Sequence, residues 1–201
     1  MPEVLILDYG VGNLLSLKIA LGKAGFSPRI TSDHKQLKNA DAVVLPGVGS
    51  FSAAVEKLGL LKTGLSEIVE SGLPILGICL GLQLFFERSE EGPGKGLALF
   101  KGKSVKLPSC LKVPHMGWNT LKIIKETKIL EGIKDDSYVY FVHSLYPVPS
   151  NKSLVCAETE YGITFASVIA SENVFGTQFH PEKSGATGLR MLENFVKIAV
   201  R

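Results

Sequence analysis

The stretch LPILGICLGLQLFFE, residues 73–87, places Cys79 between two glycines, after one apolar run and before another. The spacing G-x-C-x-G is the cysteine counterpart of the nucleophile elbow, a sharp turn from a strand into a helix. Gly77 and Gly81 permit such a turn. We expect the Cys79 thiol to stand exposed at a helix N-terminus, where free N–H groups and the helix dipole favour the nucleophilic thiolate. The alternative is a buried core cysteine between two packing glycines.

A catalytic thiol needs a base, and His180 is the candidate among the four histidines. It ends the strand-like segment NVFGTQFH and is followed by Pro181 and Glu182. Residues two apart on extended backbone point to the same side, so Glu182 can orient the imidazole while its other nitrogen faces Cys79. We predict that Cys79 is the nucleophile, His180 the base and Glu182 the acid that orients it. The alternative is a strand-end histidine beside a solvated acid.

The segment LPGVGSF, residues 45–51, follows the strand-like run DAVVL. Gly47 and Gly49 let the backbone around Val48 adopt unusual dihedrals, so that its N–H can face an anionic intermediate. The N–H of Leu80, next to the thiol, is the natural second donor. We predict an oxyanion hole here; the alternative is an ordinary glycine-rich turn.

The elements that must position these residues change character along the chain. In the first half, apolar strand-like runs alternate with helical stretches, which predicts a parallel sheet buried on both faces; the strands are 3–8, 41–47 and 73–79, and the helices 12–26, 50–61, 63–72 and 80–90. Beyond residue 92, strand-like segments joined by turns dominate, at 96–107, 138–148, 153–162, 163–172 and 173–180, before an amphipathic helix at 188–200. The predicted fold is α/β: a mainly parallel central sheet flanked by helices, with a more antiparallel β region in the second half.

Composition excludes several classes of protein. A chain of 201 residues that is 45% hydrophobic supports one large core, so we expect a single domain over 1–201. The net charge of +3 is spread along the chain, and aromatic residues do not alternate with basic clusters, which disfavours nucleic-acid binding. No apolar run reaches the ~18 residues of a membrane span, and no signal-type segment begins the chain, so a cytoplasmic protein is expected. The three cysteines suit neither a disulfide framework nor a structural zinc site.

The motifs PGVG, GICLGLQ and HPEKS together resemble class I glutamine amidotransferase domains, which hydrolyse glutamine to glutamate and ammonia. LDYGVGNLLS near the N-terminus, VPHMGWN at 113–119 and YFVHS at 140–144 narrow the resemblance to the glutaminase subunits of imidazole glycerol phosphate synthase, in histidine biosynthesis. The resemblance implies this fold and a Cys79–His180–Glu182 triad. It implies no cofactor and no metal.

The same resemblance suggests a glutamine pocket. Gly47 and Gly49 would line it, and Gln83, four residues beyond Cys79 and so on the same helix face, would recognise the substrate. The alternative for Gln83 is a surface polar residue. A further pocket loop is matched by His143, Ser144 and Leu145. The family often has tyrosine where this chain has Leu145, so only backbone contacts carry over there.

In the family, ammonia passes to a (β/α)8-barrel synthase subunit, which makes imidazole glycerol phosphate and an aminoimidazole carboxamide ribotide. We expect such a heterodimer here, with an interface that includes Trp118 in an exposed turn, and Asn13, Asn119 and Lys183. The alternative for Trp118 is core packing. Three other functions stay open: the glutaminase subunit of another amidotransferase, a stand-alone cysteine amidase, and a silent binding subunit.

Overall fold

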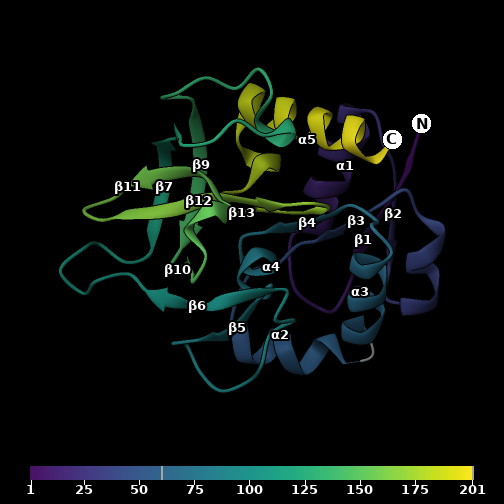
Figure 1. Ribbon diagram of the computed structural model, residues 1–201, viewed down its shortest axis with the longest axis horizontal. Coiled ribbons are helices and arrows are strands. Elements are labelled where there is room, and N and C mark those ends of the chain that lie inside the picture. Colours follow the sequence, from purple (N-terminus) through teal and green to yellow (C-terminus); the bar gives the residue numbers. More distant parts are fainter. Residues whose placement is uncertain (60, 201) are drawn as a thin grey trace.

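The computed structural model describes residues 1–59 and 61–200. Its centre is an eight-stranded sheet in the order β2-β1-β3-β4-β13-β12-β11-β8 (Figure 1). The first five strands of that order pair in parallel, and the last three are antiparallel. They are β2 (Ser27–Thr31), β1 (Glu3–Leu7), β3 (Ala42–Leu45), β4 (Ile75–Ile78), β13 (Val174–Thr177), β12 (Thr164–Ser171), β11 (Val155–Glu160) and β8 (Lys122–Ile123).

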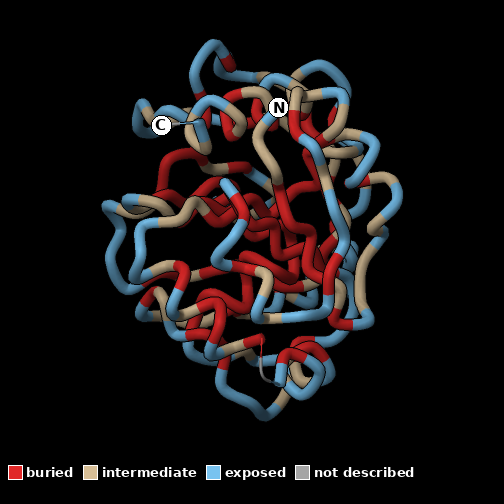
Figure 2. Tube along the Cα trace, turned by 90° about the vertical axis from the view of Figure 1, so that its right-hand side faces the viewer, coloured by how far each residue is buried: buried red, intermediate tan, exposed pale blue. Residues whose placement is uncertain are grey.

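The inner parallel strands β3, β4 and β13 are buried at every position, because helices cover both faces of the sheet. Alternate residues of β1 fall into two separate cores: Val4 and Ile6 pack under α1 (Leu14–Ala24) and α5 (Gly185–Ala199), whereas Leu5 and Leu7 pack against the opposite layer. That second layer contains α2 (Phe51–Leu58), α3 (Leu61–Glu70) and the short α4 (Leu80–Gln83). Figure 2 shows the buried residues gathered in the middle of the molecule, with exposed chain around them. The expected α/β fold with an antiparallel second half is confirmed.

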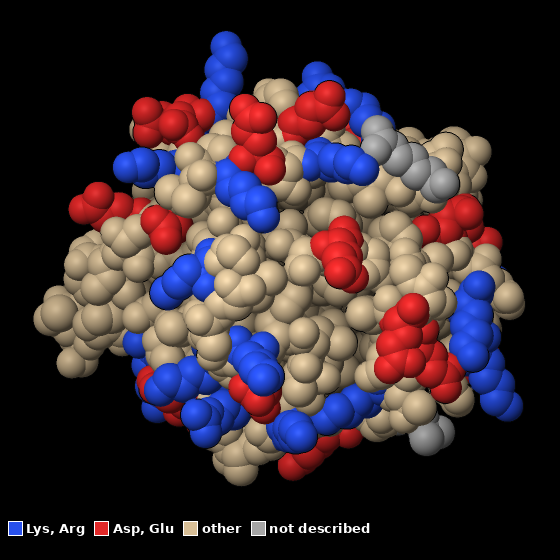
Figure 3. Space-filling view, in the orientation of Figure 1, with Lys and Arg blue, Asp and Glu red and all other residues tan. Residues whose placement is uncertain are grey.

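Two smaller sheets complete the second half. The strands β10 (Leu145–Pro149), β6 (Phe100–Lys106) and β5 (Phe86–Ser89) form one, and β7 (His115–Thr120) pairs antiparallel with β9 (Tyr138–His143) in the other. Short 3₁₀ turns lie at η1 (His34–Asn39), η2 (Lys128–Leu130), η3 (Lys152–Leu154) and η4 (Pro181–Lys183). Acidic and basic side chains are interspersed on the face shown in Figure 3, in keeping with the charge pattern of the sequence.

Three sequence-based expectations differ from this architecture. The helix predicted over 80–90 ends at Gln83, and the following residues form β5 instead. Consecutive Phe85 and Phe86 are both fully buried and both meet Phe100 of β6, so tertiary packing overrides the helical period. The turn predicted around Trp118 is strand β7. The helix predicted over 50–61 ends earlier, at Leu58 of α2, and Leu61 already belongs to α3; Leu60 lies outside the described residues.

Candidate active site

Cys79 sits at a sharp turn between β4 and α4. Its φ of 54° and ψ of −106° are strained for a non-glycine residue, the backbone signature of a nucleophile elbow. Both flanking glycines are required: a Cβ on Gly77 would lie 2.6 Å from a ring carbon of Phe85, and one on Gly81 would lie 1.8 Å from the Leu45 carbonyl oxygen. The strand therefore packs too closely on the next turn for any side chain at either position.

The expectation of an exposed thiol is wrong, because Cys79 is only 6% exposed. Strand β9 covers it, and its Sγ lies 3.7 Å from the carbonyl oxygen of Val142. The helix that follows is a single turn, so its dipole is small. Any stabilisation of the thiolate must come from neighbouring side chains rather than from α4.

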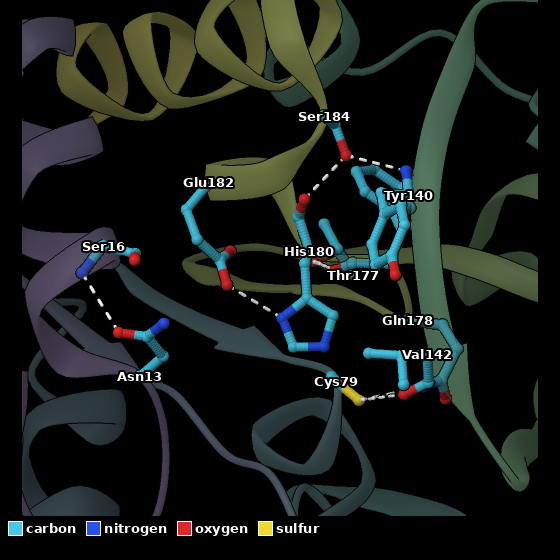
Figure 4. A network of polar contacts seen from close by, with 11 residues as sticks. Asn13, Ser16, Cys79, Tyr140, Val142, Thr177, Gln178, His180, Glu182 and Ser184 are labelled. Carbon is cyan, nitrogen blue, oxygen red and sulfur yellow. Dashed lines mark hydrogen bonds and ion pairs between the residues drawn. The ribbon is translucent and has the colours of Figure 1, made fainter. Parts of the chain in front are cut away.

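His180 and Glu182 are brought together as the extended spacing predicted. The Nδ1 of His180 lies 2.8 Å from Glu182 Oε1, and both side chains are buried. Figure 4 shows the opposite edge of the imidazole directed toward the Cys79 sulfur. Within the described part of the chain, His180 Nε2 and Glu182 Oε2 have no hydrogen-bond partner. One nitrogen is thus held by the carboxylate and the other is left for the thiol.

The backbone of His180 is fixed by residues that the sequence did not single out. Its N–H donates to the Tyr140 carbonyl oxygen at 2.9 Å, and the Ser184 hydroxyl donates to the His180 carbonyl oxygen at 2.6 Å. Ser184 Oγ also accepts the Tyr140 N–H at 2.9 Å (Figure 4). Strand β9 and the residue that precedes α5 therefore hold the backbone of His180 from two sides.

The surroundings of His180 favour its charged form. Burial disfavours the imidazolium form, but Cys79 and Glu182 outweigh it and raise the pKa of His180 to about 10. At neutral pH the histidine is therefore protonated, and an imidazolium facing a thiol stabilises the thiolate. This arrangement can supply both a nucleophile and a proton for a leaving group.

The loop after β3 lies directly against the elbow. A Cβ on Gly47 would lie 2.7 Å from the Leu80 Cβ and 2.8 Å from the Tyr9 hydroxyl, so the backbone approaches as only glycine allows. Gly49 has a φ of +103°. Tyr9, which sequence reasoning missed, donates its hydroxyl to the Pro46 carbonyl oxygen. Burial, reinforced by Cys79, raises the pKa of Tyr9 far above its usual range, so it stays a neutral donor that anchors the loop.

Of the residues expected to form a glutamine pocket, Gln83 and His143 have side chains that are already engaged within the chain. Gln83 is buried, which excludes the surface alternative, and its Nε2 lies 3.1 Å from the Leu145 carbonyl oxygen. The Nδ1 of His143 lies 2.8 Å from that same oxygen. Burial lowers the pKa of His143 to about 3, so its ring is neutral. Ser144 is half-buried and its carbonyl accepts the Leu107 N–H at 2.9 Å.

A further polar residue, Gln178, was missed by sequence reasoning. It is fully buried, its Oε1 accepts from Gln83 Nε2 at 3.1 Å, and its Nε2 lies 3.5 Å from the Cys79 sulfur. A signal for it exists in the sequence, because Gln178 lies two residues before His180 and thus on the same side of an extended segment.

The candidate partner-facing residues are at the surface. Trp118 is 54% exposed and packs edge-on against Tyr140, which excludes the core alternative. Lys183 is exposed, with its Nζ 5.9 Å from the Tyr140 ring centre. Asn13 is exposed and caps α1 by accepting the Ser16 N–H at 3.3 Å. Asn119 is half-buried and donates to the Glu160 carbonyl oxygen at 2.9 Å.

Other candidate chemistry is sparse. All three cysteines are free; Cys110 is exposed and Cys156 is buried. Among residues 1–59 and 61–200, no group of three or more His, Cys, Asp or Glu side chains is placed to hold a metal ion. Within the same residues, none of the helices is both long and apolar enough to cross a membrane.

Comparison with known proteins agrees with the motifs and the geometry. The family model for glutamine amidotransferase class-I matches residues 5–199. The chain is 53% identical over 195 residues to the imidazole glycerol phosphate synthase subunit HisH of Caldanaerobacter subterraneus, covering 94% of this chain and 95% of the relative. It is 49% identical over 200 residues to the HisH subunit of Pyrococcus furiosus, covering 98% and 100%.

Solved structures support the fold at lower identity. The structure of PurLQS from Thermotoga maritima superimposes with a TM-score of 0.80 at 20% identity, over 98% of both chains. A crystal structure of a glutamine amidotransferase gives 0.77 at 17% identity, over 98% of this chain and 99% of the other. On sequence and fold together, this chain belongs to the class-I glutamine amidotransferase family, within the group of HisH glutaminase subunits of imidazole glycerol phosphate synthase.

Proposed function

We propose that this chain hydrolyses glutamine with Cys79, His180 and Glu182 and delivers the ammonia to a synthase subunit. One observation carries the proposal: the buried His180 is bonded to Glu182 through Nδ1, while its opposite edge faces the sulfur at a strained elbow. A structural histidine gains nothing from leaving a buried nitrogen unpaired, because an unmade hydrogen bond destabilises the fold. A base that must exchange protons with a thiol requires that nitrogen free.

The proposed reaction begins with attack of the Cys79 thiolate on the side-chain amide carbon of glutamine. The negative charge that develops on the oxygen would be met by the N–H groups of Val48 and Leu80. As the carbon–nitrogen bond breaks, the protonated His180 gives its proton to the departing nitrogen and ammonia leaves. The remaining glutamyl thioester is cleaved by water, whose proton returns to His180, and glutamate and the thiolate result.

Substrate recognition would draw on the backbone around the thiol. Gly47 lets the loop backbone pack directly against the elbow, Gly49 leaves open space beside it, and the Leu145 carbonyl oxygen accepts from Gln83 on the helix that follows the elbow. Because the His143 ring is buried and engaged, we assign it to support of this wall rather than to contact with glutamine. We assign Gln83 the same supporting role, since its Nε2 is bonded within the chain.

We further propose that the partner is a (β/α)8-barrel subunit, which combines the ammonia with a phosphorylated intermediate to give imidazole glycerol phosphate and an aminoimidazole carboxamide ribotide. Ammonia released into bulk water would be protonated and lost, so transfer needs a sheltered path between two chains. The exposed Trp118, together with Asn13, Asn119 and Lys183 near the triad, supports this edge as the docking surface. No cofactor is needed for either hydrolytic step.

The test is glutamine turnover by the chain alone, with a barrel partner, and with the partner and its ligand. We expect the two chains to co-purify and turnover to rise sharply when the ligand is bound. In the same complex, Cys79→Ala should abolish glutamate release while synthesis from added ammonium continues. Full turnover by the chain alone would favour a stand-alone amidase, and loss of both activities in a folded complex would contradict separate roles for the two subunits.

A further inference from the structure

A buried chain of hydrogen bonds runs from the β7–β9 sheet to the catalytic sulfur. Its links are Asn119 Nδ2 to His115 Nε2 at 3.4 Å, His115 Nδ1 to His143 Nε2 at 3.0 Å, and His143 Nδ1 to the Leu145 carbonyl oxygen at 2.8 Å. The same oxygen receives Gln83 Nε2, Gln83 contacts Gln178, and Gln178 reaches Cys79.

The donor direction of the histidine half is fixed at the Leu145 oxygen, because a carbonyl can only accept. His143 must therefore carry its hydrogen on Nδ1, which leaves Nε2 as an acceptor. His115 must then donate from Nδ1 and accept at Nε2, where the Asn119 amide supplies a hydrogen. Both rings have to be neutral for this pattern, and burial lowers the pKa of His115 to about 4 and that of His143 to about 3.

The glutamine half is fixed from the same atom. Gln83 must present its nitrogen to the Leu145 oxygen, and its second hydrogen is directed at Gln178, 3.1 Å away. Gln178 must accept there with Oε1, which leaves its Nε2–H group facing the sulfur at 3.5 Å. The amide of Gln178 could otherwise be placed with its nitrogen and oxygen exchanged. Its orientation is set, through Gln83, by the Leu145 carbonyl oxygen.

We propose that Gln178 is a thiolate-stabilising residue and that Gln83, His143 and His115 are positioning residues that fix the direction in which it donates. A hydrogen bond given to a sulfur favours the charged thiolate over the thiol. Because Gln178 is fully buried, this bond does not compete with water. The inference rests on the proposed function, in which Cys79 is the nucleophile, and adds a second source of activation beside His180.

The test uses alkylation of Cys79 by iodoacetamide across pH, followed by peptide mass spectrometry of the full chain. Glutamine is not needed, so thiol chemistry is read separately from turnover. Exposed Cys110 in the same tube is the internal control for reagent and pH. The other titratable groups around the sulfur, His180, Glu182, Tyr9 and the neutral histidine pair, are unchanged when Gln178 alone is substituted.

Gln178→Glu keeps the shape and the acceptor for Gln83 but removes the donor to sulfur. We expect Cys79 to alkylate about tenfold more slowly at neutral pH, with its rate profile moved to higher pH, because a hydrogen bond to a charged group is lost. Gln178→Leu should move the profile the same way without adding a charge. Cys110 should react as before in both variants.

His143→Phe tests the positioning half, since it removes one donor from the Leu145 oxygen without touching the sulfur. A slowing of Cys79 alkylation in the same direction but smaller than for Gln178→Glu is expected. A lower melting temperature with an unchanged alkylation profile would make His143 purely structural and would overturn the positioning role proposed for it.

Folding is checked by circular dichroism before each profile is measured. An unchanged Cys79 profile in whichever folded variant of Gln178 is obtained overturns the inference and leaves the proposed glutaminase intact. Conversely, a slowed profile in Gln178→Glu alongside full turnover by Cys79→Ala would sustain the hydrogen bond and overturn Cys79 as the nucleophile of the proposed reaction.

Discussion

The elbow around Cys79 and the outward face of the β7–β9 sheet both lie close to His180, but the first is buried and the second is exposed. Cys79, Leu80 and Gln83 are all buried, and the Nε2 of Gln83 is bonded within the chain. On the outward face of β7 and β9, Met116, Trp118 and Tyr138 are 62%, 54% and 62% exposed. Strand alternation puts His115 and Phe141 on the inner face and these apolar side chains outside.

The contrast separates what one chain can complete alone from what it leaves to a second. The elbow has its strain, its acid–base pair and its packing supplied by this chain. The outward face leaves large apolar side chains in water next to the triad, an arrangement typical of protein interaction sites. Chemistry is therefore expected to be sensitive to small changes in the elbow, and association to changes on the outward face.

Among the variants that test this contrast, Val48→Pro, in the loop beside the elbow, is expected to have the largest effect on turnover. Proline has no backbone N–H, so the variant removes one proposed oxyanion donor, and the loss of one such donor lowers turnover by ~10²- to 10³-fold. The measurement is glutamine turnover of the complex with synthase ligand present, beside a check of folding and association. Val48→Ala, which keeps the N–H, is the matched control. Near-normal stimulated turnover of Val48→Pro would mean that this loop is only a turn.

A Trp118→Ala substitution on the outward face should weaken association with the partner by ~1–4 kcal/mol, the range for an aromatic anchor at an interface. Turnover at saturating partner and the melting temperature of the isolated chain should change little, because the side chain is outside both cores. Titration calorimetry and thermal unfolding give the two readouts. A large fall in melting temperature with unchanged affinity would assign Trp118 to stability instead.

The smallest effect concerns the inner face. His115 is stacked against Tyr161 and Phe141, and burial holds its pKa at about 4, below the ordinary value near 6.5. The unfolded chain therefore binds a proton there as pH falls below ~6.5, and stability is lost until the folded pKa near 4 is reached. His115→Phe removes that proton, so its free energy of unfolding should fall less steeply, by up to ~1.4 kcal/mol per pH unit.

Urea unfolding of both chains at several values between pH 7 and 4 checks this slope. His34→Phe is the control, because His34 is only half-buried whereas His115 is buried. If the free energy of unfolding falls equally steeply with pH in His115→Phe and in the unchanged chain, protonation of His115 in the unfolded state does not contribute to the loss of stability.

Local patterns in the sequence were sufficient for the parallel half of the fold and for the pairing of His180 with Glu182 beside Cys79. The apolar runs of β1, β3 and β4 predict strands of a parallel sheet, because a strand that is apolar on both sides must have helices over both faces of its sheet. The H-P-E spacing likewise fixes which side Glu182 takes. Such patterns act within a few residues of chain.

What escaped prediction depends on contacts between distant segments. The end of α4 at Gln83 follows from the burial of Phe86 against Phe100, which no local period reveals. The thiol is buried because β9, some sixty residues later, lies over it. Tyr9 has no local signal in the sequence, because its hydrogen-bond partner Pro46 lies in a distant loop.

The claim that Cys79 carries the reaction as a nucleophile is tested most directly by trapping its thioester. The complex is mixed with glutamine and synthase ligand, quenched in acid within a turnover, and digested for mass spectrometry. We predict a glutamyl adduct on the peptide that contains Cys79, absent without glutamine and absent from the peptide that contains Cys110. Glutamate release at full rate with unmodified Cys79, or with the adduct on another residue, would contradict the account.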